Sequence, residues 1–153
     1  MAEEKGPAIR LARDSEAEAV RRLVLGAYGH YVARIGKPPG PMLDDYAQRV
    51  AQGQVSVIEE GGRLLGILVL EDGPDAILLD NIAILPAAQG RGLGRALIVH
   101  AEAETRRRGR AQLRLYTHVL MVENIGLYAR LGFRETGRVS EKGFERVYMV
   151  KAV

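Results

Sequence analysis

The chain has 153 residues, of which 47% are hydrophobic and 27% charged, with a formal net charge of +3. These values are ordinary for one globular domain, so we expect a single domain over residues 8–153 after a flexible N-terminus at residues 1–7. No apolar run approaches the roughly 18 residues of a membrane span, and the first residues lack the apolar segment of a secretion signal. The absence of cysteine excludes disulfides, cysteine-ligated zinc and a cysteine nucleophile. We therefore expect a cytoplasmic protein without a membrane partner or a bound metal.

The first half of the chain combines strand and helix patterns. Ser15 with Glu18 fits a capping box, which predicts the start of a helix. The segment Glu60-Gly61-Gly62-Arg63 is a hairpin signal. The stretch from 31 to 54 is less regular. The predicted elements are a strand at 8–12, helices at 15–28 and 43–51, and strands at 55–59 and 64–70.

The second half predicts a central sheet. The strand at 77–85 is apolar on both faces apart from Asp80 and Asn81, as in a strand covered on both sides. A helix at 92–108, ending at Gly109, and a strand at 112–117 follow, so these strands should pair in parallel through a right-handed crossover. Beyond them we predict a helix at 122–131 and strands at 133–139 and 144–150.

Basic residues gather at the end of the helix at 92–108, in the run Arg106-Arg107-Arg108. Cations at this position interact favourably with the helix dipole and the free carbonyl groups. We prefer this structural interpretation to nucleic-acid binding, because the cluster has no interleaved aromatic residues. No nucleic-acid partner is expected.

The segment Gln89-Gly90-Arg91-Gly92-Leu93-Gly94-Arg95, which we call the glycine loop, lies between the central strand and the following helix. A glycine-rich turn at this point leaves several N–H groups directed at one spot. Together with the positive end of the helix dipole, they form a site for phosphate. Glycine is required because a Cβ would keep the anion at a distance and because such turns often need positive φ. The segment predicts a phosphorylated ligand.

Two common phosphate-binding loops do not fit this segment. A P-loop ends in Gly-Lys-Ser/Thr, and no lysine occurs between Lys37 and Lys142. A dinucleotide fingerprint needs a third glycine, where this chain has Leu97, and an acidic residue about 20 positions further on, where it has apolar residues and Arg114.

The pattern that fits is Gln/Arg-x-x-Gly-x-Gly/Ala, met by Gln89, Gly92 and Gly94. A second motif, Asn followed by Leu-Tyr, three residues and Gly-Phe, is met by residues 124–133. With both motifs in this order, the sequence resembles the GNAT superfamily of N-acetyltransferases from about Ile9 to Lys151. The resemblance implies a GNAT-like α/β fold, with a central, mostly antiparallel sheet, one splayed parallel strand pair and helices on both faces.

The resemblance also implies a co-substrate, acetyl-CoA, and the residues that bind it. Its diphosphate would lie on the glycine loop, and its pantetheine arm would pair with main-chain groups of the central strand, as an added strand does. Asn124 would hydrogen-bond the arm, although helix capping is an equal alternative. The residues implied for acetyl-CoA binding are Ile82, Ala83, Ile84, Gln89, Gly90, Arg91, Gly92, Leu93, Gly94, Arg95, Asn124 and Tyr128.

The implied activity is direct transfer of an acetyl group to a primary amine of a small molecule or peptide, through a ternary complex. Tyr128 is the candidate proton donor to the leaving thiolate, because a phenol with a pKa of about 10 stays protonated at neutral pH. The alternative is a tyrosine that packs in the core. Asp80 is the candidate base, with a pKa raised by burial, or else a carboxylate held by an arginine or a backbone N–H. Solvent can also accept the proton of the amine.

The acceptor site should come from the segment between Tyr28 and Tyr46, which matches the variable cover of the cleft in this superfamily. An ordinary helix surface is the alternative for most of its residues. Asp44 or Asp45 would suit a cationic amine, whereas Arg34 or Lys37 would suit a carboxylate, and the sequence does not decide between them. His118, which ends the strand opposite, is a further candidate, with a solvated turn histidine as the alternative. The candidate substrate residues are Tyr28, Tyr31, Arg34, Asp44 and His118.

An acyl-CoA sensor without turnover is the alternative function, because no base is obvious in the sequence. Exposed final strands leave a homodimer open.

Overall fold

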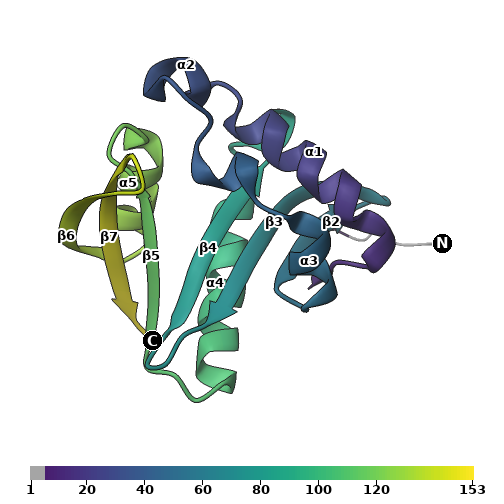
Figure 1. Cartoon of the computed structure of the whole chain (residues 1–153). Coiled ribbons are helices and arrows are strands. Elements are labelled where there is room, and N and C mark those ends of the chain that lie inside the picture. Colours follow the sequence, from purple (N-terminus) through teal and green to yellow (C-terminus); the bar gives the residue numbers. More distant parts are fainter. Residues whose placement is uncertain (1–5) are drawn as a thin grey trace.

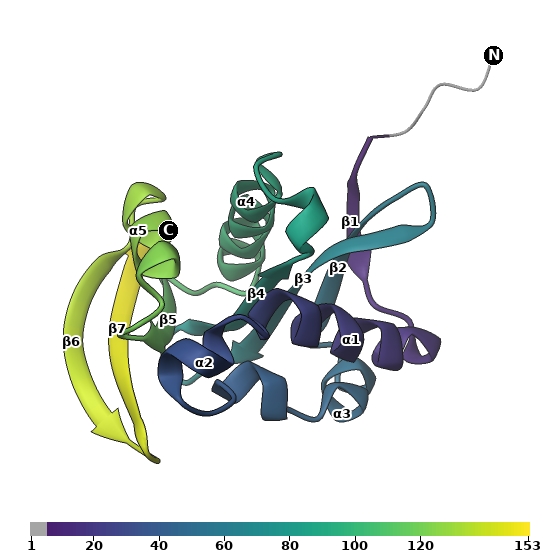
Figure 2. The ribbon, with the colours of Figure 1, turned by 90° about the horizontal axis from the view of Figure 1, so that it is seen from above.

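Residues 6–153, which the computed structural model describes, form a seven-stranded sheet with helices on both faces (Figures 1 and 2). The strand order is β1-β2-β3-β4-β5-β7-β6, and the pairs are antiparallel except for β4 and β5, which are parallel. Most of the expected flexible segment at 1–7 lies outside the described residues. The strands are β1 (Ala8–Leu11), β2 (Val55–Glu60), β3 (Arg63–Asp72), β4 (Ile77–Ile84), β5 (Gln112–His118), β6 (Arg134–Glu141) and β7 (Phe144–Ala152).

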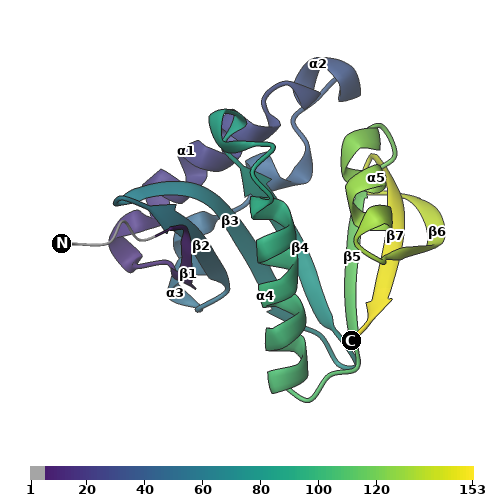
Figure 3. The ribbon, with the colours of Figure 1, turned by 180° about the vertical axis from the view of Figure 1, so that it is seen from behind.

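The helices divide between the two faces of the sheet (Figures 2 and 3). One face is covered by α1 (Ala17–Tyr28), α2 (Tyr31–Ile35) and α3 (Tyr46–Ala51). The other face is covered by α4 (Leu93–Arg107) and α5 (Val122–Arg130). Short 3₁₀ turns lie at Asp14–Glu16, Gly40–Leu43 and Pro86–Ala88. Within residues 6–153, no helix has both the length and the apolar character needed to cross a membrane.

Each face of the sheet has its own hydrophobic core. On the α1 side, Val20 and Val24 pack with the buried strand residues Val57 and Val69. On the α4 side, Leu97 belongs to the second core, which includes Leu79, Leu115 and Phe133 and also takes in Tyr128 of α5. The central strands are therefore covered on both sides, as their continuous apolar sequences require.

The expected fold class is confirmed, including the parallel pair formed by β4 and β5. The predicted start of α1 at residue 15 is wrong, since the helix begins at Ala17. The predicted capping box at Ser15 and Glu18 does not form. Instead, Glu16 accepts the N–H of Arg13 at 2.8 Å, and the helix follows the 3₁₀ turn at Asp14–Glu16. The helix α2 was not predicted, because it is too short to show a helical period. The predicted start of α3, at residue 43, is three residues early.

The two parallel strands pair over a short stretch. Ile77–Leu79 of β4 faces Leu113–Leu115 of β5, and the pairing ends there. Beyond this point the two ribbons diverge toward α2 and α5 (Figure 1). The second half of β4, from Asn81 to Ile84, therefore has β3 as its one strand partner in the described sheet.

A β-bulge marks the point of divergence. In the register between β3 and β4, Val69 faces Asn81 while Leu70 faces Leu79, which leaves Asp80 as the extra residue. A bulge bends its strand and redirects the side chains around it. In a regular strand, neighbouring side chains point to opposite faces. Here both Asp80 and Asn81 contact residues of α3 on one face.

Candidate active site

Two cavities meet at the divergence of β4 and β5. The first, of about 530 Å³, lies between the glycine loop, the second half of β4 and α5, and we call it the glycine-loop cavity. The second, of about 300 Å³, lies between β4, β5, β7 and the segment from Pro39 to Arg49, and we call it the Asp80 cavity. The same three residues, Tyr28, Asn124 and Tyr128, line both cavities. A ligand reaching from one cavity to the other would pass these side chains.

The glycine loop has the backbone conformation that its sequence predicts. Gly90 and Gly92 have φ of +82° and +77°, a region that residues with a Cβ rarely adopt. Gly92 is the N-cap of α4, a helix of 15 residues without an acidic residue in its first turn. A Cβ built at either glycine would have no protein atom within 4 Å. The loop therefore leaves an open space at a helix N-terminus that favours an anion.

The main chain of β4 forms one wall of the glycine-loop cavity. Ile82, Ala83 and Ile84 line it, and they lie beyond the last residue pair shared with β5. On their other edge they face Leu68, Ile67 and Gly66 of β3. Their free edge can therefore accept an extended ligand arm through main-chain hydrogen bonds.

The basic residues near the loop have different environments. Arg95 of α4 lines the glycine-loop cavity, as does Arg130 of α5, which the sequence analysis did not single out. Arg91 does not line it. Its guanidinium is paired with Glu60 at 2.8 Å, at the end of β2. Gln89, Leu93 and Gly94 line the cavity as well.

Tyr128 lies on α5 with its side chain 5% exposed. Its ring makes an edge contact with Phe133, with 5.7 Å between the ring centroids. Among the described residues, the Tyr128 hydroxyl has no hydrogen-bond partner, although the residue lines both cavities. Burial raises the pKa of this phenol well above its usual range, so the group keeps its proton at neutral pH. The ring packs in the core while the hydroxyl remains available to a ligand.

Asn124 lies inside α5, whose N-cap is Met121. Asn124 therefore does not cap this helix. The Asn124 amide lies 3.7 Å from the sulfur of Met121, a weak contact, and the residue lines both cavities. Within residues 6–153 its oxygen has no other partner, so the oxygen and the remaining donor capacity can bind a ligand.

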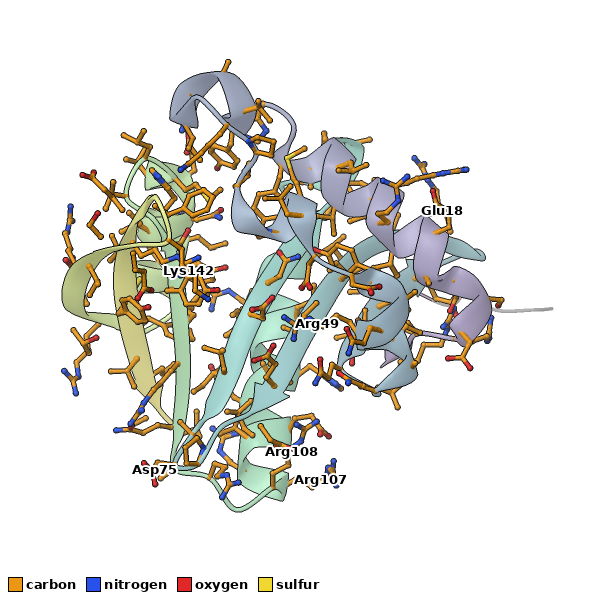
Figure 4. The ribbon with its side chains drawn as sticks, viewed as in Figure 1. Glu18, Arg49, Asp75, Arg107, Arg108 and Lys142 are labelled. Carbon is orange, nitrogen blue, oxygen red and sulfur yellow. The ribbon has the colours of Figure 1, made fainter. Side chains whose placement is uncertain are left out.

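Asp80 is largely buried, with a side chain 12% exposed. Arg49 extends from α3 toward β4 (Figure 4), and its Nη2 lies 3.5 Å from Asp80 Oδ2. Burial raises the pKa of the Asp80 carboxyl, and the charge of Arg49 opposes this shift. Arg49 also pairs with Asp44 and with Glu71, so its charge is divided among three carboxylates.

Asn81 holds a buried hydrogen-bond network beside Asp80. The Tyr28 hydroxyl lies 2.7 Å from Asn81 Oδ1 and 2.7 Å from the carbonyl oxygen of Ile82. On its other side, Asn81 Nδ2 donates to the Tyr46 hydroxyl, which donates to the carbonyl of Pro41. These bonds join α1 and α3 to the bulged part of β4 and fix the position of its main chain.

The expected acceptor residues do not all reach one cavity. Asp44 and His118 line the Asp80 cavity, and Tyr28 lines both cavities. The His118 pKa is lowered by burial, and its Nδ1 accepts the N–H of Leu120 at 3.1 Å. Tyr31 lines the glycine-loop cavity instead. Arg34 lines neither cavity and donates to Glu123 at 2.7 Å.

Tyr31 and Arg34 both bind Glu123 of α5. The Tyr31 hydroxyl donates to Glu123 Oε2 at 3.2 Å, and burial, followed by the charge of Glu123, raises the Tyr31 pKa to about 12. These contacts tie α2 to α5 across the divergence of β4 and β5. Tyr31 and Arg34 therefore fix the position of α2 relative to α5.

Sequence reasoning missed several residues of the Asp80 cavity. Tyr116 and Arg146 come from β5 and β7, and Arg49 from α3. The one available signal for these residues was a polar side chain within an apolar strand, and in the strand at 77–85 this signal marks Asn81 as well as Asp80. For the others, no local pattern shows which distant strand or helix lies opposite. The missed lining residues that carry polar groups are Arg49, Asn81, Tyr116, Thr117 and Arg146.

Comparison with known proteins gives a family for this arrangement. The family model of the acetyltransferase (GNAT) domain matches residues 51–135. The ribosomal protein bS18-alanine N-acetyltransferase of Escherichia coli is 36% identical over 78 residues, which are 51% of this chain and 53% of that protein. The matched part thus spans about half the length of this curated relative.

Solved structures resemble the whole fold. The PaiA N-acetyltransferase of Thermoplasma acidophilum, solved in complex with coenzyme A, has a TM-score of 0.82 at 16% identity, over 97% of this chain and 100% of that one. The S18-alanine N-acetyltransferase of E. coli has a TM-score of 0.76 at 23% identity, over 97% of this chain and 94% of that one. At these identities the match shows a common fold.

Proposed function

This chain belongs to the acetyltransferase (GNAT) family, and we propose that it transfers the acetyl group of acetyl-CoA directly to the primary amine of a small molecule or peptide. The observation that carries this proposal is the position of Tyr128, Asn124 and Tyr28 at the junction of the two cavities. One cavity offers an anion site and a free strand edge, and the other offers a carboxylate. The reacting groups would meet between them.

The residues of the glycine-loop cavity fit coenzyme A. Gly90 and Gly92 leave space for a diphosphate at the N-terminus of α4, where free N–H groups and the helix dipole favour negative charge. Arg95 and Arg130 line the same cavity and add positive charge. Ile82 to Ile84 would bind the pantetheine arm through their main chain, and Asn124 would donate to it from the other wall.

When bound, acetyl-CoA supplies an activated acetyl carbon: the amine nitrogen bonds to this carbon as the carbon–sulfur bond breaks. Tyr128 would donate its proton, or a hydrogen bond, to the sulfur, since its hydroxyl is protonated and unpaired among the described residues. Asp80 would take the proton that the amine loses. Its raised pKa brings this carboxylate closer to the range in which a base works near neutral pH.

Related proteins support an amine acceptor. The E. coli relative is named for acetylating the alanine of a ribosomal protein, and the acceptor of the present chain is a proposal. No covalent acyl-cysteine route is open, because the sequence has no cysteine. Direct transfer in a ternary complex is therefore the simplest path.

Thermal unfolding and free-thiol detection test the proposal together. Coenzyme A should raise the melting temperature, since a ligand that binds only the folded state at about 100 times its Kd adds about 2.7 kcal/mol. Incubation of the protein with acetyl-CoA and a library of amines should release free thiol. A thermal shift without thiol release from any amine would favour the acyl-CoA sensor instead.

A further inference from the structure

The charged side chains that line the Asp80 cavity are not equally satisfied. Arg49 is surrounded by three carboxylates and also donates to the side chain of Gln54. Its Nε and Nη1 donate to Asp44, Gln54 and Glu71. The charges of Asp44, Glu71 and Asp80 more than balance its own, so it adds no net positive charge to the cavity. Another cation, Arg146 of β7, lines the same cavity.

Arg146 has donors to spare. Its Nη1 donates to Glu141 at 2.9 Å, the Tyr148 hydroxyl is a second partner of the guanidinium, and no third acceptor is found among the described residues. The guanidinium lies over the ring of Tyr116, with 4.3 Å from Cζ to the ring centroid. Its side chain is 13% exposed, so water competes little for the remaining donors. A planar guanidinium with free N–H groups can bind a carboxylate through two hydrogen bonds.

Asp80 is the opposite charge on the other wall. It comes from the β4 bulge, and its only partner among the described residues is Arg49, at 3.5 Å. Tyr116, which lines the same cavity, comes from β5, the strand between β4 and β7. The Tyr116 pKa is raised mainly by burial, and the charges of both Asp80 and Arg146 act on it. The cavity is thus lined by a carboxylate from β4 and by a guanidinium from β7.

The cavity suits a small ligand. Its volume, about 300 Å³, is at the low end of the range of about 300 to 1,000 Å³ for small-molecule sites. Lys37, after α2, donates to the carbonyl oxygen of Gly143 in the β6–β7 turn and lies 4.2 Å above the ring of Phe144. This contact joins the α2 segment to the turn beside the cavity. A free amino acid fits a space of this size.

We propose that the acceptor is a small amine that also carries a carboxylate, such as an amino acid. Its amine lies at Asp80 and Tyr128, and its carboxylate lies on the guanidinium of Arg146. The inference rests on the proposed acetyl transfer and names the acceptor class of the same site. Arg146 is a specificity-determining residue in this arrangement, because it binds the end of the acceptor that does not react.

Matched acceptors test the proposal. Thiol release is measured with the proteinogenic amino acids, with their primary amides and with the corresponding decarboxylated amines. For the best acceptor, kcat/KM of the acid should exceed that of its amide by about tenfold or more, the value of a hydrogen bond to a charged group. Arg146→Gln should bring this ratio close to one, mainly through KM of the acid, and Arg146→Lys should restore part of it.

Arg138→Gln is the matched control. Arg138 is an arginine of β6 paired with Glu135, its side chain is 58% exposed, and it lines neither cavity. The Arg138→Gln variant should leave the ratio of kcat/KM between the acid and its amide unchanged. The thermal shift given by coenzyme A should persist in Arg146→Gln, which shows that this variant is folded.

A second measurement separates this inference from the proposed function. Calorimetry of the best amino acid against protein saturated with coenzyme A detects acceptor binding without turnover. Binding that weakens tenfold in Arg146→Gln supports the inference even when no thiol is released, although acetyl transfer itself then fails. Amides or peptides that react as well as the acids, or a ratio unchanged in Arg146→Gln, overturn the inference and leave the transferase intact. The inference is also overturned if no carboxylate-bearing amine either binds or reacts.

Discussion

The hydroxyl of Tyr28 lies 2.7 Å from the carbonyl oxygen of Ile82, which joins α1 to the half of β4 that β5 leaves unpaired. The same hydroxyl lies 2.7 Å from Asn81 Oδ1. Because a phenol carries one hydrogen, these two acceptors share it. Tyr28 is 5% exposed, so water does not readily replace this bond. The position of the open strand edge depends on a residue 54 positions away in the chain.

Tyr28→Phe should lower the free energy of unfolding by about 1–3 kcal/mol, because it leaves buried acceptors without their donor. Denaturant unfolding measures this loss. The affinity for coenzyme A should fall as well, since the carbonyl of Ile82 is no longer held in place. A variant as stable as the wild-type protein would show that water satisfies both acceptors and that the bond does not fix β4.

Gly92→Glu should abolish the thermal shift given by coenzyme A. The side chain would enter the open space at the N-terminus of α4, and its carboxylate would occupy the place of the phosphates. The positive φ of +77° should also cost about 1–2 kcal/mol of stability for a residue with a Cβ. Differential scanning fluorimetry with and without coenzyme A gives both effects.

Gly109→Ala controls for the strain in that experiment. Gly109 follows α4 at its other end and has φ of +72°. The variant should lose a similar amount of stability and keep the full shift with coenzyme A. Loss of the shift in both variants would mean that strain in α4, not access to the loop, decides binding.

Tyr128→Phe should lower kcat by roughly 10²- to 10⁴-fold, the usual range for loss of a general acid. The affinity for coenzyme A should change little, because the ring and its packing remain. Stability should change by less than about 0.5 kcal/mol, because no protein partner of the hydroxyl is found in the described part of the chain. Steady-state kinetics and calorimetry separate these effects.

Tyr148→Phe is the control for that variant. Tyr148 of β7 lines neither cavity and donates to Glu141. Tyr148→Phe should keep a normal kcat, and any change should fall on KM of the acceptor, because the Tyr148 hydroxyl shares Glu141 with Arg146. Equal turnover in Tyr128→Phe and the wild-type protein would remove Tyr128 from the mechanism.

Asp80→Asn should make the protein more stable near neutral pH and less active. The folded-state pKa of Asp80 is raised above its ordinary 3.8 by burial, so folding favours the protonated form. The contribution of Asp80 to stability is fully present below 3.8 and is lost as the pH rises through the raised value. The advantage of the asparagine variant should therefore grow over this interval and disappear below it.

Urea unfolding at a series of pH values checks the prediction. Asp75→Asn, which removes the same charge from an exposed turn (Figure 4), controls for the change in net charge. The acid limb of the kcat/KM profile should also vanish in Asp80→Asn if Asp80 accepts the proton of the amine. An unchanged acid limb would assign that step to another group or to solvent.

Much of the fold follows from local patterns in the sequence. The apolar run before the glycine loop predicts the central strand β4, and Gly109 marks the end of α4, because both signals depend on a few neighbouring residues. The same holds for the frame around Tyr128, since spacing along one helix fixes which side chains share a face. The cap of α1 was missed because several polar residues in a row can serve as caps, and packing decides among them.

The sequence by itself determined the family of this protein, the glycine turn between Gln89 and Arg95, and the placement of Asp80 on an otherwise apolar strand. Only the tertiary structure decided that β4 bulges at Asp80 and that Arg146 and Tyr116 face it across a cavity. The reason is physical: a loop conformation depends on the φ and ψ preferences of adjacent residues, whereas the register between strands is set by packing over the whole sheet. A single arginine in a strand carries no sign of which distant carboxylate it will face.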